Sequence, residues 1–214
     1  MLISHSKRFI FIHIYKVAGE SIKQALCPFD FHPNKILINR VLKKIGLPYE
    51  VSPYGQRKYP EHITALELRR NLPKKYFENY FKFAFVRNPW DWQVSNFHYG
   101  LKKKDLPSHN LFKNMKSFQE YIEWKVVNDK KLQKDFVCDE EGNIIVDYIG
   151  KMESIDKDFN HICNRLDINV RLPHINKTSH PNYNTIYNDQ TRKLIEFHFK
   201  EDIQLFDYKF EDSL

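Results

Sequence analysis

Two short segments of the chain place a basic residue and a hydroxyl where an apolar run gives way to a helix. In residues 81–95, FKFAFVRNPWDWQVS, Arg87 ends the apolar run, Pro89 suits the first turn of a helix, and Ser95 follows eight residues after the arginine. Arginine can bind a phosphate through two parallel hydrogen bonds. The spacing is about two helical turns, so Ser95 can return to the side on which Arg87 projects. The segment predicts a phosphate clamp, with an ordinary surface ion pair of Arg87 as the alternative.

The second segment, residues 15–22 (YKVAGESI), lies between the apolar run RFIFIHIY and a predicted helix over residues 20–26. The first N–H groups of a helix point towards the preceding loop, and together with the helix dipole they favour an anion there. Lys16 adds a point charge, Gly19 lets the backbone approach a ligand closely, and Ser21 adds a hydroxyl. The lysine precedes the glycine, unlike the order in nucleoside triphosphatase loops. An ordinary strand–helix turn is the alternative to a phosphate loop.

The composition is that of a globular, basic protein. The chain has 214 residues, 42% of them hydrophobic and 15% aromatic, and a formal net charge of +7. This length favours a single domain over residues 1–214, and the positive charge favours an anionic ligand or partner. The three cysteines form no CxxC pair, which is typical of reduced thiols. With no visible signal peptide and no run of ~20 apolar residues, we expect a soluble, cytoplasmic protein without a membrane span.

Hydrophobic periodicity predicts strands that alternate with helices. Residues 8–15 and 81–86 are short apolar runs typical of buried strands, whereas several longer segments carry the pattern of helices. The predicted helices cover residues 20–26, 36–45, 62–72, 89–99, 117–128, 156–166 and 189–206, a hairpin joins 136–138 to 144–146, and a loop covers 102–110. Thr64, with Glu67 three residues on, is the predicted cap near the start of the helix over 62–72. This alternation predicts an α/β fold with a central, mainly parallel sheet.

The two segments, in this order and at this separation, resemble the sulfotransferases that use 3′-phosphoadenosine 5′-phosphosulfate (PAPS). The resemblance is to sulfotransferase family 2, the carbohydrate sulfotransferases that include heparan sulfate 2-O-sulfotransferase. In that family the first loop resembles HIPKTAGTS and the second resembles FVRNPWDRxVS. Four further segments follow the family's order: 61–65 (EHITA), 147–153 (DYIGKME), 172–178 (LPHINKT) and 202–208 (DIQLFDY). The resemblance covers nearly the whole chain and implies a P-loop-like three-layer fold with helices on both faces of the sheet.

The resemblance also implies roles for individual residues. Sulfuryl transfer needs a base for the acceptor proton and positive charge for the departing oxygen, and His62 and Lys16 are expected to supply them. Arg87 and Ser95 are expected to hold the 3′-phosphate. The other residues expected to bind the cofactor are Val17, Ala18, Gly19, Glu20 and Ser21 in the first loop, and Asn176, Lys177, Thr178 and Tyr183 near the nucleotide. PAPS is the expected cofactor, and no metal is expected because basic side chains and helix N-termini neutralise it.

Three positions depart from the family pattern. Tyr15 stands where proline is usual, which makes the first loop less rigid, and Trp92 replaces a frequent arginine near the 3′-phosphate. Glu20 stands where a threonine or serine often donates a hydrogen bond to the phosphate. Because a carboxylate would repel the phosphosulfate, we expect Glu20 to point away and to pair with a nearby lysine or arginine.

The expected function is in-line transfer of a sulfuryl group from PAPS to an acceptor hydroxyl, with a histidine base. The expected partner is a carbohydrate, not a nucleic acid, and the sequence leaves the exact acceptor and the oligomeric state open. Two alternatives remain: a P-loop-like nucleotide kinase and a non-catalytic module that binds polyanions. Among the other histidines, His13 is expected to be a core residue and His174 to lie near the cofactor.

Overall fold

Parallel strands form the centre of a four-stranded sheet whose order is β1-β2-β3-β4. The strands are β1 (Leu2–Ser4), β2 (Phe9–Ile12), β3 (Phe81–Val86) and β4 (Tyr148–Lys151). β2, β3 and β4 run parallel, and β1 pairs antiparallel with β2 at one edge. The computed structural model describes residues 1–29, 41, 44–46, 59–173 and 181–211. The predicted α/β fold with a mainly parallel sheet is confirmed.

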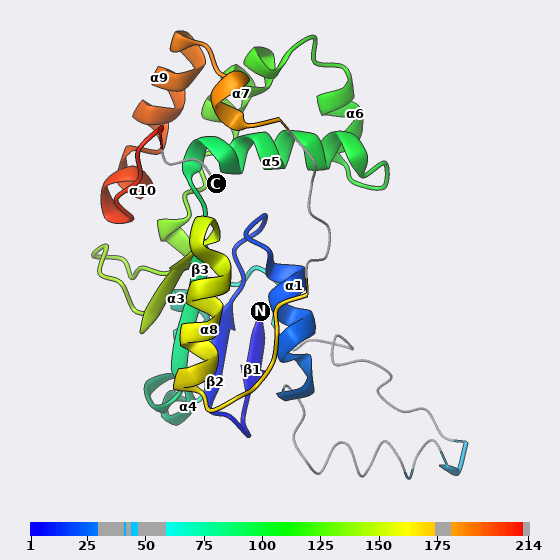
Figure 1. The fold of residues 1–214 in the computed structure, drawn as a ribbon, viewed down its shortest axis with the longest axis vertical. Coiled ribbons are helices and arrows are strands. Elements are labelled where there is room, and N and C mark those ends of the chain that lie inside the picture. Colours follow the sequence, from blue (N-terminus) through cyan, green and yellow to red (C-terminus); the bar gives the residue numbers. More distant parts are fainter. Residues whose placement is uncertain (30–40, 42–43, 47–58, 174–180, 212–214) are drawn as a thin grey trace.

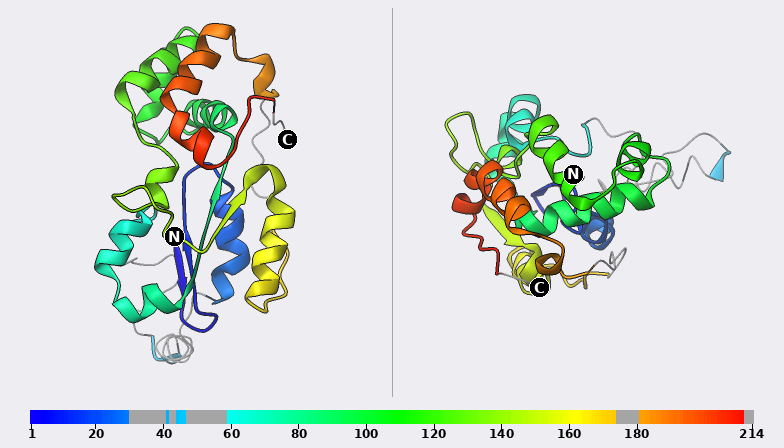
Figure 2. Two further views of the ribbon diagram at one scale, coloured as in Figure 1. Left: turned by 90° about the vertical axis from the view of Figure 1, so that its left-hand side faces the viewer. Right: turned by 90° about the horizontal axis from the view of Figure 1, so that it is seen from above.

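Helices cover both faces of this sheet (Figure 2). On one face lie α1 (Gly19–Leu26) and α8 (Ile155–Arg165), and on the other lie α3 (Ala65–Asn71) and α4 (Lys74–Asn79). The arrangement has three layers, because a parallel sheet is stable only when both of its apolar faces are covered.

A group of helices lies beyond the carboxyl ends of the parallel strands (Figure 1). It comprises α5 (Pro89–Lys102), α6 (Ser108–Lys113), α7 (Phe118–Asn128), α9 (Asp189–His198) and α10 (Lys200–Leu205). Short 3₁₀ turns, η1 (Cys27–Phe29), η2 (Lys134–Phe136), η3 (Met152–Ser154) and η4 (Tyr183–Thr185), complete the described elements. In sheets of this type the carboxyl ends of the strands are where ligands usually bind.

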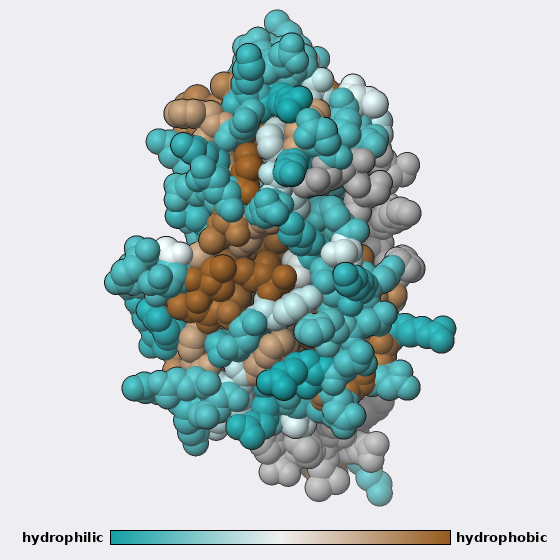
Figure 3. Space-filling view, turned by 60° about the vertical axis from the view of Figure 1, so that its left-hand side comes forward, coloured by the Kyte–Doolittle hydropathy of each residue, from teal (hydrophilic) through white to brown (hydrophobic). Residues whose placement is uncertain are grey.

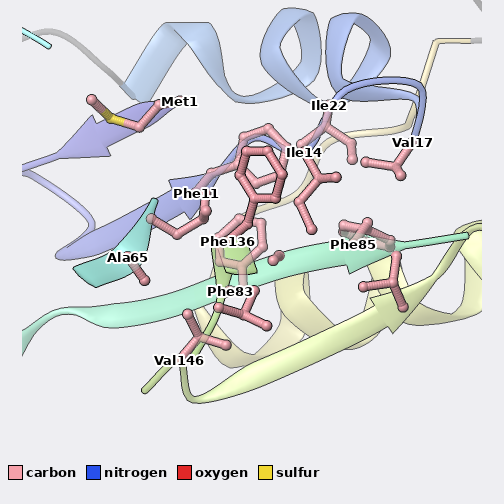
Figure 4. Packing of buried hydrophobic residues seen from close by; sticks show 14 of the residues in the cluster. Met1, Phe11, Ile14, Val17, Ile22, Ala65, Phe83, Phe85, Phe136 and Val146 are labelled. Atoms are coloured by element: carbon pink, nitrogen blue, oxygen red, sulfur yellow. The ribbon is translucent and has the colours of Figure 1, made fainter. Parts of the chain in front are cut away.

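The core lies between the sheet and its covering helices. All four residues of β2 are fully buried, as are Phe83 and Phe85 of β3, and Val17 and Ile22 pack above them from the first loop and α1 (Figure 4). Each such side chain contributes about 1.5–3 kcal/mol when it leaves water. The two strand ends that carry the site are therefore rigidly held. Outside the core, Figure 3 shows a mostly hydrophilic face with a group of hydrophobic residues at mid-height.

Capping residues mark the starts of α3 and α5. The predicted cap at Thr64 is confirmed: its hydroxyl accepts from the Glu67 N–H at 3.1 Å, and the Glu67 carboxylate accepts from the Thr64 N–H at 2.9 Å. Such a capping box stabilises a helix by about 1 kcal/mol. Asn88 caps α5 with its side-chain oxygen, which accepts from the Trp90 N–H.

Several predicted boundaries were wrong. The strand predicted over 8–15 covers only Phe9–Ile12, because Arg8 has a left-handed φ of 54° and the ladder to β3 ends at Ile12. The predicted hairpin is reduced to one isolated bridge between Cys138 and Ile144, preceded by η2. Part of the predicted loop at 102–110 belongs to α5 and α6. Most of the helix predicted over 36–45 lies outside the described residues.

Candidate active site

The first loop joins β2 to α1 through strained backbone. Lys16 and Ala18 have left-handed φ values of 65° and 56°, which cost roughly 1–2 kcal/mol at each non-glycine residue. The Ile22 N–H makes the first helical hydrogen bond, to the Ala18 carbonyl at 3.1 Å, and no side chain caps the helix. The N-terminal end of α1 therefore offers N–H groups and a positive dipole end to an anion.

Gly19, the first residue of α1, is required by a packing contact. A β-carbon at this position would lie 1.7 Å from Nε2 of His13, far inside the closest possible contact. We expected a ligand to approach the Gly19 backbone closely; in the structure the group that does so is the His13 ring. His13 is 5% exposed, which confirms its predicted place in the core, and burial lowers its pKa to about 3, so the ring is neutral.

The Lys16 ammonium lies 3.6 Å from the centroid of the Tyr99 ring, at the boundary between the first loop and α5. Burial, together with the positive charges of Arg87, Lys102 and Lys103, lowers the pKa of Lys16 to about 8. The neighbouring charges that act on Lys16 are thus all positive. A cation cluster of this kind is stabilised when an anion binds among its members.

Arg87 links the two loops. Its guanidinium is almost fully buried, Nε donates to Asp91 Oδ2 at 2.6 Å, and Nη1 donates to the Lys16 carbonyl at 3.2 Å. The ion pair that the sequence offered as the alternative therefore exists, but it is buried in the site instead of lying on the surface. The structure brings the Arg87 guanidinium to the backbone carbonyl of Lys16, and the roles of both residues in binding stay a prediction.

Side chains from distant parts of the sequence fix the backbone of the second loop. The Gln133 amide accepts from the Arg87 N–H at 2.9 Å and donates to the Arg87 carbonyl at 2.7 Å. The N–H of Gln133 is in turn bound by the Asp202 carboxylate at 2.8 Å. The Glu153 carboxylate accepts from the Asn88 N–H at 2.6 Å. The second loop is therefore held in place before any ligand binds.

Ser95 carries a buried hydroxyl that lacks a partner. The residue is 1% exposed on α5, and its Oγ makes no hydrogen bond within the described residues. Leaving such a group unsatisfied costs about 1–3 kcal/mol. Native proteins rarely accept that cost without a reason such as a ligand. An oxygen-rich anion would satisfy this hydroxyl, so Ser95 fits the predicted role in phosphate binding.

Trp92 anchors the first loop to α5. Its indole Nε1 donates to the Tyr15 carbonyl at 2.7 Å, and the two rings lie 4.8 Å apart. The position that carries an arginine in many sulfotransferases therefore serves here to fix Tyr15, which itself replaces the usual proline. The two departures from the family pattern are in direct contact.

His62 lies at the carboxyl end of β2. Its Nδ1 is 2.9 Å from the His13 carbonyl oxygen, which can only accept, so Nδ1 carries the proton. The neutral ring then keeps its lone pair on Nε2, the form that a general base requires. Burial lowers the pKa of His62, which keeps the ring neutral at physiological pH.

A cluster of charged residues lies next to the first loop and includes Glu20 of that loop. Glu20 pairs with Lys23, so the expectation that Glu20 points away to a basic residue is confirmed. Lys23 is buried and also pairs with Glu61, whose carboxylate lies 3.2 Å from Nδ1 of His13. Ligand atoms of His13, Glu61 and His62 lie within 4.8 Å of one another. The Lys23 ammonium already supplies the positive charge that Glu61 needs, so we assign no metal ion to this cluster.

The remaining predicted cofactor residues are placed only in part. Tyr183 is buried, its hydroxyl donates to the Phe210 carbonyl at 2.6 Å, and the Asn88 amide donates to the same hydroxyl at 3.2 Å. It supports the second loop through Asn88, and direct contact with a nucleotide stays a prediction. Three residues of the first loop, Val17, Ala18 and Ser21, lie at the uncapped end of α1. Asn176, Lys177, Thr178 and His174 lie outside the described residues.

Sequence reasoning missed the residues that position the two loops. Asp91 could have been found, since an aspartate four residues after an arginine on a helix is the spacing of an ion pair. Glu61 stands next to the predicted base, although its partners lie far away in the sequence. Gln133 and Glu153 had no local signal, because each binds backbone groups more than 40 residues distant.

The fold and the site together define an α/β protein in which two strand–helix junctions and their basic residues lie side by side. The model of the sulfotransferase family matches residues 1–209, so the chain belongs to the sulfotransferase family. Membership supports transfer of a sulfuryl group to a hydroxyl acceptor.

A protein of Archaeoglobus fulgidus named only as uncharacterized is 31% identical over 127 residues, which are 58% of this chain and 99% of that protein. No solved structure gives a significant match. Within the ranges that the structure describes, none of the helices is both long enough and apolar enough to cross a membrane.

Proposed function

We propose that this protein transfers the sulfuryl group of PAPS to a carbohydrate hydroxyl, with His62 as the general base and Lys16 as the main source of positive charge. The observation that carries the proposal is the junction of the two loops. Arg87 Nη1 donates to the Lys16 carbonyl, which joins the guanidinium of the second loop to the backbone of the first loop beside the N-terminal end of α1. A donor with phosphates at both its 3′ and 5′ positions needs two anion sites held at a fixed separation.

The residues present fit such a donor. PAPS, when bound, supplies a sulfuryl group on a 5′-phosphate leaving group. The N–H groups at the start of α1, with Lys16, would hold the 5′-phosphosulfate, and Val17, Ala18, Gly19 and Ser21 contribute through the same turn. Arg87 and the unsatisfied Ser95 hydroxyl would hold the 3′-phosphate. Asn176, Lys177, Thr178 and Tyr183 remain our candidates for the nucleotide.

Two side chains then have separate tasks. Nε2 of His62 accepts the proton of the attacking hydroxyl, because its Nδ1–H is committed to the His13 carbonyl. Lys16 is protonated at neutral pH, since its pKa is about 8, and it places positive charge where the leaving oxygen becomes negative. Neither step requires a metal ion, and positioning by the two loops supplies the rest of the catalysis.

Binding of adenosine 3′,5′-bisphosphate, measured by calorimetry, tests the donor site directly. We expect it to bind more tightly than adenosine 5′-monophosphate or ADP, and to bind equally well with and without magnesium. A preference for ADP with magnesium would instead support the nucleotide kinase. Transfer of labelled sulfate from PAPS to a panel of glycosides then tests the reaction. A protein that binds polyanions in a salt-sensitive manner but forms no sulfated product would identify the non-catalytic alternative.

A further inference from the structure

A cavity of about 230 Å³ lies between α5, α6 and α7. Most of its wall is aromatic, formed by Tyr15, Tyr99, Phe112, Tyr121 and Trp124. Pockets for drug-sized molecules usually exceed about 300 Å³, so this cavity has room for a single ring and not for a chain of several. The anion-binding residues of the two loops, Lys16, Arg87 and Ser95, are not among those that line it.

The cavity shares its walls with both of the groups assigned to chemistry. Tyr99, which lines it, also carries the Lys16 ammonium 3.6 Å above its ring. Tyr15, which lines it from the first loop, presents its ring to the His62 ring in an edge contact with centroids 6.0 Å apart. A molecule in the cavity would therefore contact the Tyr15 ring, which touches His62, and the Tyr99 ring, which carries the Lys16 ammonium.

The polar groups of the cavity carry no net charge. Lys125 and Asp129 both line it, and they form an ion pair with each other. Asn96 also lines it, and its amide Nδ2 is buried without a hydrogen-bond partner in the part of the chain that the structure describes. Ser108 adds a hydroxyl from the start of α6. These groups can bind hydroxyls, whereas the one cation is already neutralised.

We propose that this cavity is the acceptor subsite and that it takes one uncharged pyranose ring. This inference rests on the proposed function and narrows its acceptor. The negative faces of aromatic rings attract the positively polarised C–H groups of a sugar. The Asn96 amide, Ser108 and the Lys125–Asp129 pair supply partners for its hydroxyls. A uronate or a sulfated ring would bring a negative charge next to Asp129, and Lys125, the one cation among the residues that line the cavity, is already paired with Asp129.

A matched pair of sugars tests the charge preference. Methyl β-glucopyranoside and methyl β-glucuronide differ in the group at C6, which is a neutral hydroxymethyl in the first and a carboxylate in the second. Ligand-observed NMR on the full-length protein measures the binding of each, and this readout does not depend on PAPS. We expect the glucoside to bind at least tenfold more tightly than the glucuronide. Tighter binding of the glucuronide, or binding of neither sugar, would overturn the inference.

A pair of variants on α6 tests whether the sugar binds in this cavity. Ser108→Trp fills the cavity with a large ring, whereas Asn110→Trp places the same ring on an exposed position of the same helix. We expect Ser108→Trp to abolish glucoside binding and to raise the KM for the glucoside acceptor at least tenfold, measured as formation of the sulfated product. Asn110→Trp should leave both unchanged. Equal glucoside binding in the two variants would place the sugar elsewhere.

Calorimetry with adenosine 3′,5′-bisphosphate separates this inference from the proposed function. Both variants should keep the donor affinity of the unmodified protein, which also shows that they are folded. If the glucoside binds in the cavity but the bisphosphate does not bind at all, the donor assignment fails while the sugar subsite stands. If the bisphosphate binds but the glucoside does not, the donor assignment stands and the subsite fails.

Discussion

The first and second loops stand at the ends of neighbouring parallel strands, yet they are built differently. In the first loop, Lys16 and Ala18 hold left-handed backbone conformations, and the Lys16 side chain is only half-buried over Tyr99. In the second, Arg87 is 5% exposed, pairs with Asp91 and has its backbone N–H and carbonyl bound by Gln133. One loop presents a cation that can adjust, and the other presents a cation that is locked.

This difference matches two different tasks. A group that stabilises charge developing during a reaction must reach the leaving oxygen, whereas a group that recognises a fixed phosphate gains from rigidity. The proposed base lies at the same end of β2, because His62 donates to the His13 carbonyl just after that strand. We therefore expect changes at the end of β2 to act mainly on kcat and changes at the end of β3 to act mainly on donor affinity.

The largest expected effect is that of His62→Gln. Loss of a general base lowers the rate by about 10²–10⁴-fold. The glutamine can still donate to the His13 carbonyl, so the affinity for adenosine 3′,5′-bisphosphate should change little. Steady-state sulfate transfer measures the first quantity and calorimetry the second. His161→Gln, a change at an exposed histidine on α8, is the control and should be fully active. A His62→Gln enzyme with normal kcat would end the assignment of the base.

Lys16→Met should cause the second-largest loss of kcat. Removing one stabiliser of a developing negative charge costs about 10²–10³-fold in kcat. Methionine keeps a side chain of similar length against the Tyr99 ring, so the loop should stay folded. Lys104→Met, at an exposed position after α5, is the matched control for loss of a positive charge. If Lys16→Met and Arg87→Met weakened donor binding alike without a separate effect on kcat, the proposed division between the loops would be wrong.

The Arg87–Asp91 pair allows rigidity and recognition to be separated. Arg87→Met alone removes the guanidinium that pairs with the buried Asp91 carboxylate, which should cost about 3–5 kcal/mol of unfolding free energy. The double change Arg87→Met with Asp91→Leu removes both charges and should recover most of that loss. Urea denaturation measures the stability of each form. Donor affinity should stay low in both, because neither retains the guanidinium; recovered binding in the double variant would show that Arg87 serves only the fold.

Much of the local structure was predictable because its causes are local. The apolar run at 81–86 and the Thr64 capping box each involve residues a few positions apart, and both are found as predicted. The pairing of Glu20 was predictable from charge alone. The links between the loops were not, since Trp92 binds the Tyr15 carbonyl and Gln133 binds Arg87 through contacts that only the folded chain creates. A side chain that binds a distant carbonyl leaves no periodic signal in the sequence.

The pH dependence of kcat/KM should reflect the ionisation of His62 and of Lys16. His62 must be neutral, so activity falls below its pKa, which burial lowers from the ordinary value near 6.5. Lys16 must be protonated, so activity falls above about pH 8. Each limb should lose about tenfold per pH unit. Lys16→Arg should move the alkaline limb upward, because a guanidinium stays protonated. An unchanged alkaline limb in that variant would assign it to another group.

Ser95→Ala should have the smallest effect on the fold and the most selective effect on the ligand. Its hydroxyl is buried without a partner, so removing it should leave the unfolding free energy unchanged or raise it. A hydrogen bond to a charged group contributes about 1.5–3 kcal/mol, so affinity for adenosine 3′,5′-bisphosphate should fall about 10–100-fold.

Two comparisons make that result specific to the second loop. Adenosine 5′-monophosphate lacks the 3′-phosphate, so its affinity should be the same for Ser95→Ala and for the unmodified protein. Ser154→Ala provides the opposite case, because the Ser154 hydroxyl donates to Asp158 at 2.7 Å and its loss should lower stability without a change in donor affinity. If Ser95→Ala behaved like Ser154→Ala, the Ser95 hydroxyl would not bind the donor. Recognition of the 3′-phosphate would then depend on Arg87 alone.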